Sequence, residues 1–171
     1  MATPRSLDRF GGDVHVAGRL TCGEFSLPES TVRNENIVSE AGIEADKLQH
    51  QYTPGYAQES ATAAADEARV IHVAQGDGTI IGFLAGNVVS AIGDDTCTVD
   101  LKKNGTTVLS APVSLVAADP VAYAEKTGTI SSASYSAGDV LEVVINATHN
   151  TGTLAKGIYA SAVLQEDANP S

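Results

Sequence analysis

The sequence has no tryptophan, one methionine and two cysteines among its 171 residues, and only 10 Lys and Arg residues against 21 Asp and Glu. The formal net charge of −11 argues against a nucleic-acid-binding protein, because Lys and Arg contacts with phosphates supply most of that affinity. No apolar run approaches the roughly 18 residues that a membrane-spanning helix needs. Residues 1–10 lack the apolar region of a secretory signal, so we expect no such signal.

The two cysteines, Cys22 and Cys97, lie far apart and outside the Cys-x-x-Cys spacings of zinc and redox sites. Because no export signal is expected, we interpret both as reduced, partly buried thiols rather than as a disulfide. The absence of tryptophan also leaves few aromatic platforms for a sugar ring, which counts against a carbohydrate-binding module.

Residue types that perform catalysis or bind metals form no recognisable motif. The four histidines are His15, His50, His72 and His149. No two of them have a metal-ligand spacing, and no nucleophile elbow or glycine-rich phosphate loop occurs. Asp94 and Asp95 lie in a Gly-Asp-Asp turn, where a weak structural cation is the alternative to an ordinary turn. We therefore expect no enzyme, no cofactor and no metal site, with a hydrolase using paired acids as the enzymatic alternative.

The composition changes near Arg69. Residues 70–171 are dense in Val, Ile, Thr, Ala and Gly, and short apolar runs alternate there with turn residues. About seven or eight strands in such a length are typical of a sandwich or jelly roll. We predict an all-β protein with two parts: an extended N-terminal arm over residues 1–69, and an antiparallel, jelly-roll-like β-sandwich over residues 70–171.

Alternation and turn signals predict the individual strands. Cys97, Val99 and Leu101 fall on one face of a strand, and Asn104-Gly105 after it predicts a type I′ hairpin. Pro112 within the return strand indicates an edge or a bulge. The expected strands cover residues 69–74, 79–85, 88–92, 97–103, 106–115, 128–132, 140–147 and 157–165.

The arm spreads its large apolar side chains too thinly to form a core of its own. Residues 13–25 alternate weakly and suit a β-ribbon, residues 39–49 suit a short helix, and residues 58–69 suit a solvated helix or an ordered loop. Its apolar anchors must be buried against a partner chain or the flank of the β domain. The predicted trimer or capsid interface consists of Phe10, Val14, Leu20, Phe25, Val32, Ile37, Ile43, Leu48, Tyr52 and Tyr56.

Among these anchors, Ile37, Ile43 and Leu48 are candidates for packing at a threefold axis. The alternative is that they close the open end of their own sandwich. Tyr52 and Tyr56 are expected to mark the junction between the arm and the domain. His72, on an apolar strand, is expected to be a satisfied core or interface histidine, and His50 a polar interface contact.

Several stretches resemble structural proteins of tailed bacteriophages. In the arm, VRNENI at residues 32–37 precedes AGIEADKLQH at residues 41–50, an Asn-rich turn before a Gly-Ile-x-Ala-x-Lys-Leu step. In the β domain, VDLKKNGTTVL at residues 99–109 and AGDVLEV at residues 137–143 are similar to hairpins of such proteins. By these motifs the chain resembles capsid decoration (cement) proteins and the shafts of trimeric fibres.

The resemblance implies a homotrimer of jelly-roll domains on the outer capsid surface of a virion, made in the cytoplasm of the host bacterium. Its partners would be the major capsid protein and itself, without nucleic acid or membrane. A protein that binds only the expanded shell stabilises it by mass action, and three linked arms multiply weak contacts through effective concentration. The resemblance transfers no catalytic residue.

Two further alternatives stay open. A trimeric tail-fibre or receptor-binding module would need exposed aromatic side chains on distal loops, for which Tyr123 and Tyr135 are the candidates. An extracellular adhesion domain would need an export signal, which the first residues do not offer.

Overall fold

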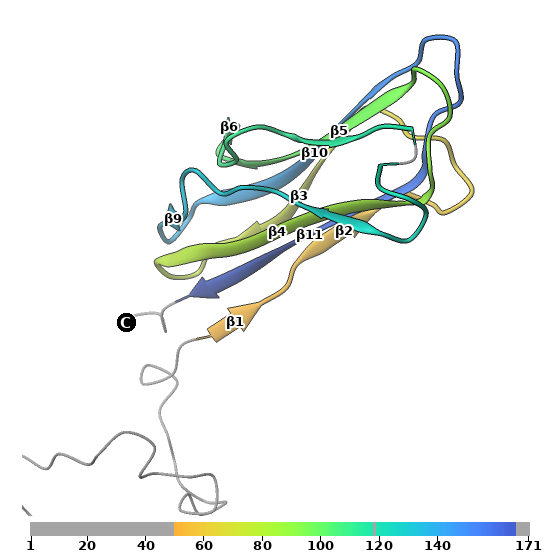
Figure 1. The fold of residues 1–171 in the computed structure, drawn as a ribbon. Helices are drawn as coiled ribbons and strands as arrows, with labels where there is room; N and C mark the ends of the chain where they lie inside the picture. Colours follow the sequence, from red (N-terminus) through yellow and green to blue (C-terminus); the bar gives the residue numbers. More distant parts are fainter. Residues whose placement is uncertain (1–49, 118, 167–171) are drawn as a thin grey trace, which may run out of the picture. The chain divides into compact units, whose positions relative to one another are not determined.

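The computed structural model describes residues 50–117 and 119–166, which form two antiparallel β-sheets packed face to face (Figure 1). These residues contain no helix, so none in this part of the chain could cross a membrane. The prediction of an all-β antiparallel sandwich is confirmed for this part of the chain.

The first sheet, sheet A, is built on two long neighbouring strands, β4 (Gly78–Val89) and β11 (Lys156–Glu166). Four short strands extend it. Two pair with β11 at one edge, and two pair with β4 at the other. They are β1 (His50–Tyr52) and β2 (Gly55–Ala57) on β11, and β8 (Glu125–Thr127) and β9 (Ser134–Tyr135) on β4.

The second sheet, sheet B, has β10 (Val140–Thr148) and β5 (Thr96–Lys103) as its central strands. β3 (Glu67–Val73) pairs with β10 and forms one edge. Two short strands pair with β5 at the other edge. They are β6 (Thr106–Thr107) and β7 (Val113–Leu115).

The core lies between the sheets and consists of alternate residues of the four long strands. The predicted inward face of β5 is confirmed, because Cys97, Val99 and Leu101 are all buried. The other inward residues of both sheets are equally buried, and removing them from water is the main stabilising contribution to such a fold. They include Leu141, Val143 and Ile145 of β10, Ile80, Phe83 and Ala85 of β4, and Ile158, Ala160, Ala162 and Leu164 of β11.

The predicted Asn-Gly hairpin is confirmed. Asn104 and Gly105 have positive φ values of 49° and 80° and join β5 to β6. Such a turn needs left-handed backbone at both central positions, which Asn and Gly adopt most readily. The predicted return strand is divided into β6 and β7, and Pro112, which cannot donate a ladder hydrogen bond, lies in the break between them.

Two other expectations change, and one pair of alternatives is decided. Residues 79–92 were expected as two strands broken at Gly86-Asn87, but β4 runs unbroken through both residues. Residues 128–132 contribute only an isolated bridge between Ile130 and Leu109, and β8 lies just before them. Of the two alternatives for residues 58–69, the structure has a loop, and the strand β3 begins within the range at Glu67.

Asn87 is the exception to the apolar core. It is fully buried in β4 beside Ile158, and neither its Oδ1 nor its Nδ2 atom has a hydrogen-bond partner within the described residues. A buried amide without partners costs free energy, because it has lost its bonds to water.

We expect Asn87→Leu to raise the free energy of unfolding by about 1 kcal/mol, because an apolar side chain of similar size carries no desolvation cost. Urea denaturation monitored by circular dichroism measures this change. Asn146→Leu, at an exposed outward position of β10, is the control and should leave the midpoint unchanged. A lower midpoint for Asn87→Leu would contradict the interpretation.

Candidate functional site

The predicted interface residues divide into two groups. Phe10, Val14, Leu20, Phe25, Val32, Ile37, Ile43 and Leu48 lie outside the described residues, as does the helix expected over residues 39–49. Tyr52 and Tyr56 lie in β1 and β2, and both strands pair with β11. The candidate site is therefore the place where β1 and β2 pair with sheet A, which we call the arm junction and define as His50, Tyr52, Tyr56, His72, Tyr135 and Glu166.

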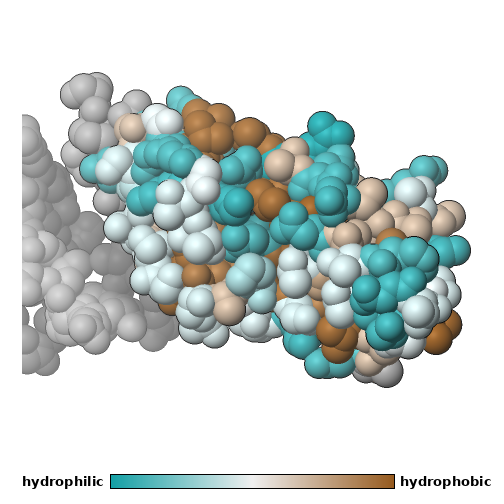
Figure 2. All heavy atoms as spheres, turned by 90° about the horizontal axis from the view of Figure 1, so that it is seen from above, coloured by the Kyte–Doolittle hydropathy of each residue, from teal (hydrophilic) through white to brown (hydrophobic). Residues whose placement is uncertain are grey.

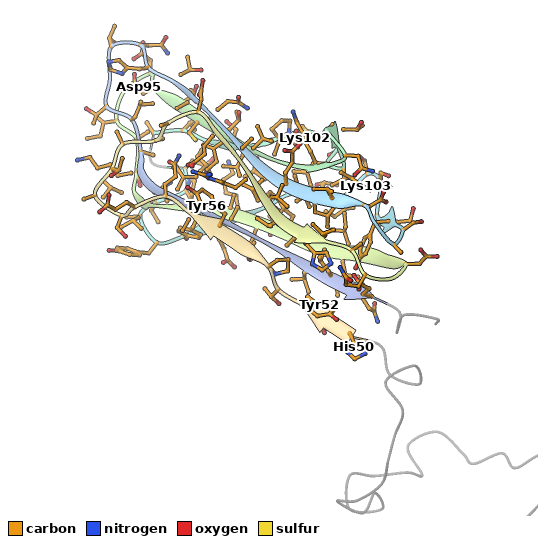
Figure 3. The ribbon with its side chains drawn as sticks, turned by 180° about the vertical axis from the view of Figure 1, so that it is seen from behind. His50, Tyr52, Tyr56, Asp95, Lys102 and Lys103 are labelled. Atoms are coloured by element: carbon orange, nitrogen blue, oxygen red, sulfur yellow. The ribbon has the colours of Figure 1, made fainter. Side chains whose placement is uncertain are left out.

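Tyr52 links the first strand to the edge of the second sheet. Its ring centroid lies 5.6 Å from that of His72 on β3 and 6.3 Å from that of His50. His72 in turn meets Tyr135 edge to face at 6.3 Å. Figure 3 shows His50 and Tyr52 at one end of the sandwich and Asp95 at the other. Tyr52 itself is 41% exposed.

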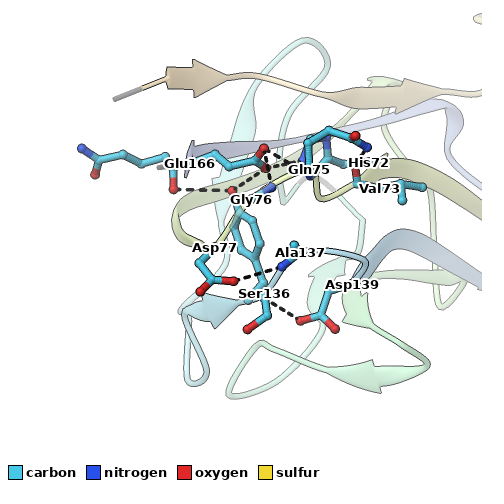
Figure 4. A network of polar contacts seen from close by, with 11 residues as sticks. His72, Val73, Gln75, Gly76, Asp77, Ser136, Ala137, Asp139 and Glu166 are labelled. Carbon is cyan, nitrogen blue, oxygen red and sulfur yellow. Dashed lines mark hydrogen bonds and ion pairs between the residues drawn. The ribbon is translucent and has the colours of Figure 1, made fainter. Parts of the chain in front are cut away.

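Glu166 accepts hydrogen bonds with its carboxylate from several elements at the arm junction (Figure 4). It is 97% buried at the end of β11, opposite His50 of β1. Its Oε1 atom accepts hydrogen bonds from the backbone N–H groups of Gln75 and Gly76, at 3.2 and 3.1 Å. Its Oε2 atom lies 3.0 Å from His72 Nε2 and accepts a longer bond of 3.4 Å from the Tyr135 hydroxyl.

The expectation that His72 is a satisfied core or interface histidine agrees with this contact. The carboxylate of Glu166 is therefore a hub that ties the end of β11 to the turn after β3 and to β9. Buried carboxylates are tolerated where several donors reach them, and each bond to a charged group is stronger than a neutral one.

Tyr56 makes a second link between the two sheets. Its hydroxyl donates a hydrogen bond of 2.6 Å to Glu67 Oε2 on β3, and Gln58 Nε2 donates another of 3.2 Å to the same oxygen. Arg69 lies over the Tyr56 ring at 5.8 Å and pairs with Glu67. The hydrogen bond to Glu67 and partial burial raise the pKa of Tyr56, and the bonds from Tyr56 and Gln58 lower the pKa of Glu67.

At the opposite end of the sandwich, two carboxylates, those of Asp94 and Asp95, also join separate segments of the chain. Asp95 is fully buried and accepts backbone hydrogen bonds from Asn150 and Gly152, at 2.8 and 3.0 Å. Its other oxygen lies 2.5 Å from Nδ1 of His149. Asp94 accepts bonds from both the N–H and the hydroxyl of Thr151. This Asp94-Asp95 turn thus fastens the β4–β5 loop to the β10–β11 loop.

This arrangement agrees with an ordinary structural turn at Asp94-Asp95. Both oxygens of Asp95 and Oδ1 of Asp94 are bonded to groups of the neighbouring loop. Within the described part of the chain no group of three or more His, Cys, Asp or Glu residues is placed to hold a metal ion. Cys97 is free and buried, and burial, with the nearby charge of Asp66, raises the pKa of its thiol to about 12.

Stability should fall in acid because of this turn. Burial raises the pKa of Asp95, but the bonds from His149, Asn150 and Gly152 outweigh it and hold the pKa below the ordinary 3.8. The pKa of Asp94 is also lowered, mainly by the Thr151 N–H. A carboxyl whose pKa is lowered on folding stabilises the fold above its ordinary pKa, and that contribution is lost as the pH falls through the lowered value.

We therefore expect the melting temperature to fall as the pH drops below about 3.8, the ordinary pKa of these carboxyls. Asp95→Asn should lower the melting temperature at neutral pH and flatten its fall in acid, because the amide cannot ionise. Differential scanning calorimetry between pH 2 and 7 measures both effects. Asp119→Asn, in an exposed pair with Lys126, is the control and should retain the steep fall in acid.

The arm junction has its own test in Glu166→Gln. The amide keeps the shape but offers only one acceptor oxygen, so we expect the free energy of unfolding to fall by about 2 kcal/mol. Amide exchange at His50–Tyr52 should become faster than in the wild type, since β1 pairs with this end of β11. Glu142→Gln, on the outer face of β10, should change neither quantity. Unaltered exchange in Glu166→Gln would show that β1 does not depend on this hub.

The end of the sandwich opposite the arm junction, which we call the distal end, also exposes apolar side chains. Val121 and Tyr123 of the loop before β8 are 61% and 76% exposed, and Ile92 of the β4–β5 loop is 66% exposed. Tyr123 has a positive φ of 61°, and its N–H donates to the carbonyl of Asn87. Tyr135, the other aromatic candidate for a distal contact, is buried at the arm junction, so that expectation is wrong for Tyr135.

No family model matches the sequence, and no curated protein matches it. What the chain does must therefore be argued from its own residues.

Proposed function

We propose that the protein is a virion structural protein that decorates and cements the outer surface of a tailed-bacteriophage capsid. In this proposal it is a homotrimer without catalytic activity, and the segment before β1 bridges neighbouring copies of the major capsid protein. The sequence motifs that resemble cement proteins motivate the proposal. The architecture of the arm junction supports it physically.

The observation that carries the proposal is that the chain enters the domain as a strand of sheet A. β1 pairs antiparallel with β11, with His50 opposite Glu166, and β11 pairs in turn with nearly the whole of β4. A pull along β1 loads its ladder hydrogen bonds together in shear, because these bonds are perpendicular to the strand. Tension in a bridging arm would therefore pass into the central strands of the domain.

Two tyrosines of the arm junction also suit the transmission of force from the arm. Tyr52 and Tyr56 attach the strands β1 and β2 to β3 of the second sheet through His72 and Glu67. A force on the arm is thereby shared between both sheets. A cement protein needs such a connection, since its stabilising effect on a shell is limited by the weakest link between arm and domain.

Removal of residues 1–49, which leaves β1 intact, should abolish binding to capsids while the domain stays folded. The measurement is co-sedimentation of the full-length and truncated proteins with capsids that lack the protein, prepared from the virus that encodes it. Circular dichroism of the truncated protein checks the fold. A folded truncated protein that still sediments with capsids would refute the role of the arm.

The alternative is a trimeric tail-fibre or receptor-binding module. The exposed Tyr123, held at an unusual backbone angle, favours it, because strained residues are often retained for recognition. Tyr123→Ala separates the two functions when capsid co-sedimentation and adsorption to host cells are both measured. The variant should leave capsid binding unchanged if the protein is a cement protein. In a receptor-binding module it would weaken adsorption to host cells.

A further inference from the structure

The hairpin turn between β5 and β6 contains the only Asn-Gly pair in the sequence, Asn104-Gly105. Asparagine deamidates most readily before glycine, because glycine has no Cβ atom to hinder attack by its backbone nitrogen on the side-chain carbonyl. Both residues are exposed, and a Cβ atom on Gly105 would meet nothing within 4 Å in the described part of the chain. Figure 2 shows the molecule from the side on which β5 and β6 lie in Figure 1, and this surface is mostly hydrophilic or neutral. Water, the second reactant, therefore reaches the pair.

The Asn104 side chain is held in place by the residues at the start of β10. Its Nδ2 atom donates a hydrogen bond of 2.7 Å to Asp139 Oδ1, and its Oδ1 atom accepts one of 2.9 Å from the Val140 N–H. The backbone N–H of Asn104 donates to the Val140 carbonyl, also at 2.9 Å. The amide group, which must turn toward the Gly105 nitrogen in order to react, is therefore bound at both of its polar atoms.

Asp139 is itself fixed as an ionised acceptor. Its Oδ2 atom accepts a hydrogen bond of 2.9 Å from the Ser136 N–H in the turn between β9 and β10 (Figure 4), and Lys103 Nζ lies 3.8 Å from the same oxygen. The Ser136 N–H, followed by the Asn104 amide, lowers the pKa of Asp139, so its carboxylate is charged at neutral pH. A hydrogen bond to a charged acceptor is stronger than one between neutral groups, so the Asp139 bond restrains the amide most.

We propose that Asn104 is a deamidation site and that Asp139 restrains its reaction in the folded protein. The Gly105 backbone nitrogen attacks Asn104 Cγ, and its proton passes through solvent to the departing Nδ2, which leaves as ammonia. Water then opens the resulting succinimide at one of its two carbonyls, giving aspartate or isoaspartate. Only water enters and only ammonia leaves, so the reaction needs no enzyme, oxidant or cofactor. The inference does not depend on the proposed function.

The product places a charge where the restraining hydrogen bond was. A carboxylate at position 104 replaces the donor Nδ2 with an oxygen, so two like charges face each other at a contact of 2.7 Å in the amide form. Isoaspartate also adds a carbon atom to the main chain, which a two-residue type I′ turn does not accommodate. Deamidation therefore releases the β5–β6 hairpin from the turn between β9 and β10, and the release is irreversible.

Asp139→Ala tests the restraint in the full-length protein, with Asp77→Ala as the matched control. Asp77 Oδ1 accepts a hydrogen bond of 3.1 Å from the Ala137 N–H of the same turn (Figure 4), but within the described residues it has no hydrogen bond with Asn104. Each protein is kept in mildly alkaline buffer, which favours the deprotonated backbone nitrogen. Peptide mapping by mass spectrometry follows the conversion of Asn104 with time. The same proteins in guanidinium chloride give the rate without the fold.

We expect the folded wild type and Asp77→Ala to deamidate at Asn104 roughly tenfold more slowly than the unfolded protein, the rate equivalent of one hydrogen bond to a charged group. Folded Asp139→Ala should approach the unfolded rate. Equal rates in the two folded variants, or a folded wild type as fast as the unfolded one, would overturn the restraint. An unfolded protein that keeps Asn104 intact would overturn the site itself.

Circular dichroism checks that Asp139→Ala is folded. If it is not, Asp139→Asn takes its place, because its amide keeps an acceptor oxygen without the charge. Its expected rate lies between those of the wild type and the unfolded protein, and a wild-type rate would contradict the role of Asp139.

Asn104→Asp tests the release of the hairpin directly. Amide exchange at Val140, whose N–H donates to the Asn104 side chain, should be faster in this variant than in the wild type. Asn146→Asp adds the same charge at an exposed position of β10 and should leave the exchange unchanged. Wild-type exchange in Asn104→Asp, or equal acceleration in both variants, would refute the release.

Discussion

The antiparallel pairing of β4 with β11 supports nearly everything else in the described part of the chain. Both edges of sheet A consist of short strands that could not persist alone, since isolated pairs of a few residues are marginal in water. β1 and β2 depend on β11, and β8 and β9 depend on β4. Two tyrosines reinforce the pair by lying across glycines of β4, with Tyr159 over Gly86 and Tyr135 over Gly78.

The sequence predicted those parts of the fold that depend on neighbouring residues. Alternation located the inward face of β5, and Asn104-Gly105 located the hairpin, because side-chain period and turn chemistry are local properties. The prediction from sequence failed at Gly86-Asn87, where the residue types favour a turn but the structure continues β4. The residue that makes the glycine suitable for a strand is Tyr159, which is distant in sequence and adjacent only through the β4–β11 register.

The residues of the candidate site show the same division. The sequence predicted a junction at Tyr52 and Tyr56, but it did not predict the contacts of Glu166 or of the Asp95–His149 pair. Glu166 meets His72 across 94 positions of sequence, and Asp95 meets His149 across 54. One signal was present: Glu166 continues the inward alternation of Ala162 and Leu164, so a carboxylate at that position had to be buried. What it would bind could not be derived without the topology.

The length of β11 separates the two ends of the domain. Eleven residues at about 3.3 Å each place the arm junction and the Asp94-Asp95 turn roughly 35 Å apart. This distance is about four times the Debye length at physiological ionic strength, which is roughly 8 Å. Solvent-exposed charges gained or lost on the distal loops are therefore largely screened at the junction. Exposed positions of the distal loops can therefore change charge with little effect on the electrostatics of the arm junction.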